Sequence, residues 1–279
     1  MSIPPLEWLE GAEVDPAVLD LRPDYRVLLL TAEGLRPGPP DDASEAVLRA
    51  AEDLVRSSAA TSAGGPSPEH PAGNATAPGR SVGNATSPGR SDAGPTAPGQ
   101  STGAAVRPEV AAWHDAFRAF GAKPQRTRPS VDALLRRASA PAGGLPRVDR
   151  ITDVYNAVSV THLLPIGGED LDAYTGPPRL LRATGTEPFD TVANGDPVVE
   201  HPEPGEVVWT DAAGVTCRRW NHRQCVRTRL TERTTRAAFI LDALDPVDRI
   251  RLESAGDALV AALRAVHPDV TVQRRLIGA

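Results

Sequence analysis

The stretch that decides the fold spans residues 151–172 and reads ITDVYNAVSVTHLLPIGGEDLD. Its first half places Val154, Ala157 and Val158 at helical spacing, which predicts an amphipathic helix with one buried face. Asn156 lies beside that face, and a buried carboxamide requires hydrogen-bond partners. Asn156 therefore either fixes the backbone of a loop or binds the amine or ester of a ligand.

The second half of the stretch changes character at Pro165, which ends the predicted helix. Gly167 and Gly168 follow at a predicted turn, where the missing Cβ atoms allow a backbone or a ligand to approach closely. Glu169 and Asp170 come directly after them. The stretch thus combines an amide, a glycine pair and two carboxylates, which makes it a candidate binding site.

Helices dominate the chain before this stretch. Residues 25–35 predict one buried strand, and helices are predicted over 41–57 and 129–139, the second with Ser130 as its N-cap. One more helix is indicated by the helical spacing of its apolar residues, Val110, Trp113, Phe117 and Phe120.

Short strands dominate the chain after it. The predicted strands are 179–184, 206–211, 215–220, 237–244 and 269–277. A hairpin is expected at residues 211–214, and a helix over 245–266 with Pro246 in its first turn. Helices early and strands later indicate the α+β class, as a single domain with a mixed sheet and packed helices. The strand at 25–35 is expected to rejoin that sheet.

A Pro/Gly/Ser-rich segment interrupts this pattern at residues 58–105 and contains a near-repeat, GNATAPGRSV followed by GNATSPGRSD. Such a composition cannot bury enough apolar surface to offset chain entropy, so a disordered insertion is expected. Residues 1–57 are then the N-terminal strand and helix of the domain, and 106–279 its core with a C-terminal helix and strand.

Composition excludes some classes of protein. The net charge of −6 argues against a surface that binds nucleic acid everywhere, although a local basic patch remains open. No apolar run approaches 18 residues, so no membrane span or membrane partner is expected. Two cysteines and no signal-like start lead us to expect a cytoplasmic protein.

A local basic patch is predicted at residues 217–236, which hold seven arginines and one acid, Glu232. Guanidinium groups bind phosphate oxygens and an aromatic ring can stack on a base, so RNA binding is one interpretation. The candidate RNA-binding residues are Arg218, Arg219, Trp220, Arg223, Arg227 and Arg229. The alternative is an ordinary surface with solvated, internally paired charges.

Metal and cofactor sites find little support. Cys217, His222 and Cys225 form a Cys-x4-His-x2-Cys pattern, but a structural zinc needs a fourth ligand that no usual spacing supplies. Neither Gly-x-Ser-x-Gly nor a glycine-rich phosphate loop is present. We therefore expect no metal and no cofactor.

The quoted stretch, followed by GEVVWTDAAGVTCRRWNHRQCVRTRLTERTTRAAFILDAL at 205–244, resembles the B3/B4 domain of the phenylalanyl-tRNA synthetase β subunit. It resembles more closely the free-standing proteins built around that domain, and the resemblance covers roughly residues 106–245. It implies an α+β domain that, in the synthetase, hydrolyses tRNA carrying tyrosine in place of phenylalanine.

Candidate site residues follow from the resemblance. Asn156 matches the asparagine of the Asp-Val-Thr-Asn-Tyr motif and Thr234 the threonine of the Asp/Glu-Asp/Glu-Thr motif, which line the synthetase's pocket and are candidate catalytic residues here. Gly167 occupies the place of the pocket histidine, and 224–226 that of the Gly-Gly-Glu acid. The candidate substrate-binding residues are Gly167, Gly168, Glu169, Asp170 and Asn221.

The resemblance implies an editing-type domain that binds the aminoacylated acceptor end of a tRNA and hydrolyses a mischarged ester in trans. Amide, hydroxyl and backbone donors would stabilise the oxyanion, and Glu169 or Asp170 would orient water or hold the α-ammonium of the amino acid. Two alternatives stay open: a module that binds an amino acid or a tRNA end without hydrolysis, and a hydrolase of small amino-acid esters or amides.

Overall fold

The computed structural model describes residues 3–63 and 106–278. The predicted disordered insertion lies outside these residues, except for its first six positions. Those six continue helix α3, Asp42–Ala63, past residue 57, where it was predicted to end.

The central sheet has the strand order β11-β2-β10-β3, with all neighbours antiparallel. Its strands are β2 (Arg26–Glu33), β3 (Ile166–Asp170), β10 (Arg236–Ala243) and β11 (Thr271–Ile277). Strand β2 thus lies between β10 and β11, in the same sheet as the strands that follow residue 106. The apolar runs of β2 and β10 are buried on both faces, which explains their continuous rather than alternating hydrophobicity.

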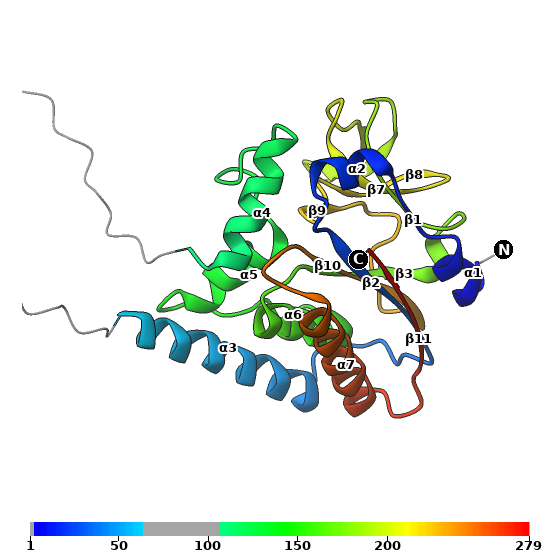
Figure 1. Cartoon of the computed structure of the whole chain (residues 1–279). Coiled ribbons are helices and arrows are strands. Elements are labelled where there is room, and N and C mark those ends of the chain that lie inside the picture. The colour runs from blue at the N-terminus through cyan, green and yellow to red at the C-terminus, as the bar shows by residue number, and fades with distance from the viewer. Residues whose placement is uncertain (1–2, 64–105, 279) are drawn as a thin grey trace, which may run out of the picture.

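Helices cover one face of the central sheet. Helix α6 (Arg150–His162) and helix α7 (Arg249–Val266) pack there, with α3 on the outer side of α6. Figure 1 shows these three helices on one side of β2, β3 and β10. Leu28, Phe239 and Leu241 point to this face and share a core with Val154 and Leu259.

A second sheet lies over the other face (Figure 1). Its order is β1-β4-β7-β8-β9, and it is mixed because β1 is parallel to β4. Its strands are β1 (Glu13–Val14), β4 (Arg179–Arg182), β7 (Val207–Asp211), β8 (Gly214–Arg218) and β9 (Arg223–Gln224). A hairpin of β5 (Phe189–Ala193) and β6 (Asp196–Glu200) adjoins it.

The remaining helices border the two sheets. They are α1 (Pro5–Glu10), α2 (Pro16–Leu21), α4 (Pro108–Ala119), α5 (Ser130–Ser139) and the 3₁₀ turn η1 (Leu171–Ala173). The predicted α+β class with packed helices is confirmed. Across residues 3–63 and 106–278, no helix is long and apolar enough to cross a membrane.

Three local predictions were wrong. The glycine pair lies inside β3 rather than in a turn, since Gly167 pairs with Ile240 and Gly168 with Phe239. Helix α5 has Pro129, not Ser130, at its N-cap position. Helix α7 begins only at Arg249, because the Asp248 side chain caps it by accepting from the amide of Arg251.

Candidate functional site

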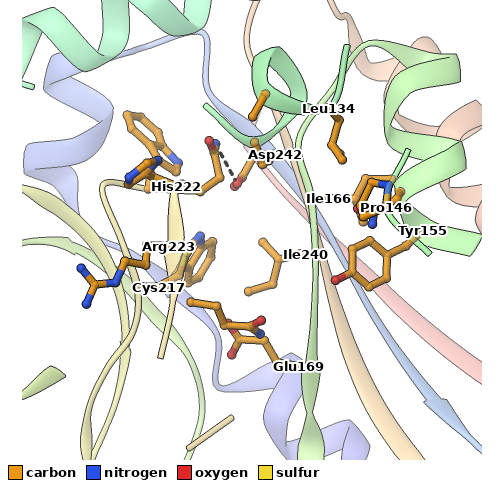
Figure 2. Close-up of a pocket in the computed structure, with 18 of the residues that line it drawn as sticks. Leu134, Pro146, Tyr155, Ile166, Glu169, Cys217, His222, Arg223, Ile240 and Asp242 are labelled. Atoms are coloured by element: carbon orange, nitrogen blue, oxygen red, sulfur yellow. Dashed lines mark hydrogen bonds between the residues drawn. The ribbon is translucent and has the colours of Figure 1, made fainter. Parts of the chain in front are cut away.

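A cavity of about 300 Å3 lies between the two sheets, bordered by α5 and α6 (Figure 2). Its floor is the central sheet, where Gly167 and Glu169 of β3 lie on the same face as Ile240 and Asp242 of β10. The second sheet and the β8–β9 turn supply the opposite wall, with Trp209, Cys217, Asn221, His222, Arg223 and Gln224.

The two adjacent glycines have different structural roles. A Cβ atom built on Gly167 would meet nothing within 4 Å, so this glycine leaves the cavity floor open. A Cβ atom on Gly168 would lie 2.7 Å from the ring of Tyr155, which packs against the other face of β3. Gly168 therefore allows close packing of α6 on the sheet, and it is Gly167 that makes room for a ligand.

Asp242 is a buried acid of the cavity, with a side chain held by neutral groups. It is 2% exposed, and its two carboxyl oxygens accept from the hydroxyl of Tyr25 at 2.6 Å and from the amide of Asn221 at 3.4 Å. Burial raises the pKa of Asp242 to about 7, although these hydrogen bonds act to lower it. The carboxyl is thus poised to gain a full charge when a cation enters the cavity.

Glu169 is the second buried acid and is also 2% exposed. The hydroxyl of Tyr174 donates a hydrogen bond to its carboxyl, and Gln224 next to it donates to the backbone oxygen of Gly168 at 2.8 Å. Burial raises the pKa of Glu169 to about 7, against the lowering effect of the Tyr174 hydrogen bond. Figure 2 shows Ile240 between Glu169 and Asp242, so the two acids lie at opposite sides of the cavity.

Asn156 projects from α6 and lines the cavity while only 7% exposed. The helix is fixed at its start by Asp149, which accepts from the amides of Ile151 and Thr152. The carboxamide of Asn156 makes no side-chain hydrogen bond to any part of the chain that the structure describes. Because this amide is open to the cavity and bonds to no described protein group, the ligand-binding interpretation is favoured over the loop-fixing one.

The wall opposite the floor ends in a strained turn at residues 219–222. Arg219 and Trp220 have φ angles of 47° and 66°, which non-glycine residues rarely adopt. The indole of Trp220 is fully buried, edge-on to Tyr25 at 5.0 Å and to Trp113 at 5.3 Å between ring centroids. The ring thus anchors the turn in the core while Trp220 also lines the cavity, and its stacking on an RNA base stays a prediction.

The family model of the B3/4 domain matches residues 112–272. The chain belongs to the B3/4 domain family. Every residue that lines the cavity lies between positions 130 and 242, within the matched region.

Among solved structures, this B3/4 domain protein is similar to an N-terminal fragment of the phenylalanyl-tRNA synthetase β-subunit from Pyrococcus horikoshii. The sequence identity is 11% and the TM-score 0.42, and the alignment covers 96% of this chain and 54% of that chain. The chain thus spans about half the length of that fragment. No curated protein matches the chain.

The B3/4 domain uses most of its predicted RNA-binding arginines internally. Arg218 is 5% exposed and makes a two-pronged ion pair with Glu206, at 2.9 and 2.8 Å. Arg227 does the same with Asp211, at 2.8 and 2.7 Å. The charges of Arg218 and Arg227 are thus neutralised in buried or half-buried pairs, which favours a structural role, and RNA binding by these two residues stays a prediction.

The other three arginines differ in how accessible they are. Arg223 lines the cavity and bonds to Glu200 at 2.8 Å, whereas Arg219 lies 3.8 Å from Glu206. Arg229 is exposed, and the described residues hold no side-chain partner for it. This stretch is thus largely the internally paired surface that the alternative interpretation expected.

Thr234 and Asp170 lie apart from the cavity. The buried hydroxyl of Thr234 donates to Asp170 at 2.6 Å and accepts from the amide of Thr231 at 2.9 Å. Neither side chain is among those that line the cavity. Thr234 therefore orders the loop before β10 and does not line this cavity, and its catalytic role stays a prediction.

Several cavity residues were missed by sequence reasoning, among them Asp242, His222, Gln224 and Arg137. Asp242 had a recognisable signal, because it is the one acid in the apolar run AAFILDAL, and a charged residue inside a buried strand needs a special environment. Across the part of the chain that the structure describes, no group of three or more His, Cys, Asp or Glu residues could hold a metal ion.

Proposed function

We propose that this B3/4 domain binds the aminoacylated end of a tRNA and hydrolyses the ester of mischarged aminoacyl-tRNA in trans. The observation that carries the proposal is the cavity itself. It contains two acids with raised pKa values, Glu169 and Asp242, and the carboxamide of Asn156, which has no protein partner, and Arg137 lies at its edge. Membership in the B3/4 family and the motif resemblance to the editing domain of the synthetase support the same conclusion.

The cavity suits the amino-acid part of such a substrate. A volume of about 300 Å3 is at the lower end of small-ligand pockets, and its walls combine the apolar side chains of Trp209, Ile166 and Ile240 with polar groups that can orient a ligand. An α-ammonium group would pair with Glu169 or Asp242, whose hydrogen-bond partners are neutral hydroxyls and an amide. Pairing with a cation would return the pKa of that acid toward its usual value and so strengthen binding.

The cavity also suits ester chemistry. An aminoacyl ester is already activated, so positioning of one water molecule and stabilisation of the oxyanion supply much of the catalysis. The amide of Asn156 has no competing protein partner, which leaves it available to donate to the carbonyl oxygen of the ester as negative charge develops there. Asn221 is held toward Asp242 and leaves its own carbonyl oxygen buried without a partner.

RNA phosphates would meet basic groups at and near the edge of the cavity, most of which lie outside the stretch 217–236. Arg137 of α5 is exposed and lines the cavity. A second hollow of about 220 Å3 adjoins the turn and is lined by Lys123, Arg126 and Arg219. Within the described residues, neither Lys123 nor Arg126 has an ion-pair partner, so both charges are available to phosphates. A substrate of this class implies that the protein acts in the cytoplasm, where translation occurs.

The test is release of the amino acid from a panel of correctly and incorrectly charged tRNAs. We expect catalytic turnover on at least one mischarged pair, inhibition by uncharged tRNA, and a rate at least tenfold lower in Asn156→Ala. Stoichiometric binding without turnover would instead identify a binding module. Turnover of small amino-acid esters that excess tRNA does not inhibit would identify a small-molecule hydrolase. Either result would overturn the proposal.

A further inference from the structure

We propose that His222 is the general base that activates the hydrolytic water in the cavity. This inference rests on the proposed function, and it assigns the reaction's proton transfer to a residue that neither the motif resemblance nor the family match identifies.

The hydrogen bond of the ring fixes which nitrogen can act. Nδ1 of His222 lies 2.8 Å from the backbone carbonyl oxygen of Arg128. A carbonyl oxygen can only accept, so Nδ1 carries the hydrogen and, in the neutral ring, Nε2 carries the lone pair. No described residue hydrogen-bonds to Nε2, and the ring lines the cavity (Figure 2). Nε2, the nitrogen that can accept a proton, is thus the one without a hydrogen-bond partner among the described residues.

The protonation state of the ring fits that role. Burial lowers the pKa of His222, and the nearby guanidinium groups of Arg219 and Arg223 lower it further. The Arg128 carbonyl and the carboxylate of Glu206 act in the opposite direction. Other charged or titratable groups of the same cavity are Arg137, Glu169 and Asp242. His222 is therefore unprotonated at neutral pH and ready to accept a proton.

The turn that carries the ring holds it rigidly. The amide of His222 bonds to the carbonyl of Arg218 at 3.2 Å, and the indole of Trp220 anchors the turn in the core. The two residues before Asn221 have left-handed backbone angles, and strain of this kind is concentrated at functional sites. The strained backbone places Asn221 and His222 side by side on the cavity wall.

The reaction then balances as follows. Nε2 of His222 takes a proton from water while the water oxygen bonds to the ester carbonyl carbon, giving a tetrahedral oxyanion. Collapse of this intermediate re-forms the carbonyl and breaks the bond to the ribose oxygen, which takes the proton back from Nε2. The products are the free amino acid and a tRNA with a free terminal hydroxyl, and no other reactant is consumed.

The test compares His222→Gln with the wild-type protein on a mischarged tRNA that the wild type hydrolyses. A glutamine amide can still donate to the Arg128 carbonyl but cannot act as a base. We expect kcat to fall about 10²- to 10⁴-fold, with KM changed less than threefold. The matched control is His201→Gln, an exposed histidine outside the cavity, which should retain the wild-type rate.

The pH profile separates a base from a structural residue. The wild-type rate should fall at low pH as His222 gains a proton, and this acid limb should disappear in His222→Gln but persist in Asp242→Asn. A second variant, His222→Ala, should regain activity when imidazole is added. The inference about His222 is overturned if His222→Gln is active and keeps the acid limb of the wild-type pH profile. It is also overturned if folded His222→Ala is not rescued by imidazole. Neither result affects the proposed function. No turnover by the wild-type protein overturns the proposed function as well.

Discussion

The hydroxyl of Tyr25, the residue directly before β2, donates a hydrogen bond of 2.6 Å to the carboxyl of Asp242 in β10, joining residues 217 positions apart. A residue that precedes positions 64–105 in the chain thus orients an acid of the cavity that follows them. Because Asn221 approaches the other carboxyl oxygen, the acid is oriented from two sides.

Tyr25→Phe should weaken both the fold and the cavity's affinity for amines. The loss of a buried hydrogen bond should lower the free energy of unfolding by about 1–2 kcal/mol, measured by urea unfolding. It should also raise the pKa of Asp242 further, so that an aminoacyl analogue with a free ammonium group binds more weakly at pH 7. Tyr174→Phe should act in the same way through Glu169, and an unchanged affinity in both variants would argue against acid-assisted binding.

Asp242→Asn and Glu169→Gln should reveal the stability cost of these acids. Each acid has a folded-state pKa near 7, above that of the unfolded chain, so the native state holds more protons between about pH 4 and 7. Stability of the wild type should therefore fall as pH rises through this window. Each amide variant should be more stable than the wild type at pH 8, by on the order of 2–3 kcal/mol, and lose that advantage near pH 4. Parallel urea midpoints at both pH values would contradict this assignment.

The two glycines of β3 offer a matched pair of substitutions. Gly168→Ala should destabilise the fold by about 1–3 kcal/mol, because its Cβ atom would lie 2.7 Å from Tyr155. Gly167→Ala should leave stability nearly unchanged, since its Cβ atom meets open space. Gly167→Leu should fill the cavity and weaken binding of an aminoacyl-tRNA analogue about tenfold or more. Equal effects of the two alanine variants on the urea midpoint would be inconsistent with these roles.

Arg137→Glu should weaken RNA binding more than Arg264→Glu, a variant with the same change of charge far from the cavity. Loss of one phosphate contact on single-stranded RNA should reduce the steepness of the fall of log affinity with log salt concentration by about 0.7. Arg264→Glu is the control, because Arg264 is exposed on α7, which packs on the opposite face of the central sheet. Filter binding across a salt series measures both, and identical slopes would place the RNA elsewhere.

Arg218→Ala should behave as a folding variant rather than as an RNA-binding variant. Breaking its ion pair would leave the buried carboxylate of Glu206 without its main partner, which costs about 3–5 kcal/mol. The salt slope of RNA binding by the remaining folded protein should be unchanged. A normal urea midpoint together with weaker RNA binding would reverse this conclusion.

Periodicity predicted much of the fold because local spacing reports burial directly. The apolar runs that became β2 and β10 and the 3.6-residue pattern of α4 need no distant information. The short strands β1 and β9 were missed, because a two-residue strand is too short to show a pattern of alternating apolar residues. Each forms only because the neighbouring strand has unpaired backbone groups at its edge. The predicted glycine turn failed for a related reason: pairing with β10 extends a segment that has no side-chain pattern of its own.

Part of the candidate site was also predictable. Asn156 and Gly167 were chosen from motif positions, Glu169 and Asn221 from the chemistry of their side chains, and all four line one cavity. Thr234 was chosen in the same way and lies elsewhere, bonded to Asp170. A motif position specifies a residue's neighbours along the chain, whereas membership of a cavity depends on which direction the side chain takes in space.

The sequence by itself determined the class of the fold, the approximate position of most of its longer helices and strands, and the amide, glycine and carboxylate that meet in the cavity. These features follow from local periodicity, from the chemistry of single residues and from a motif confined to one segment. Tertiary structure alone decided that Arg218 pairs inside the protein, that Trp220 anchors a turn, that Tyr25 bonds to the cavity acid Asp242, and that His222 lines the same cavity. Charge and burial depend on partners brought together by folding, and no residue's partner can be read from its own position in the chain.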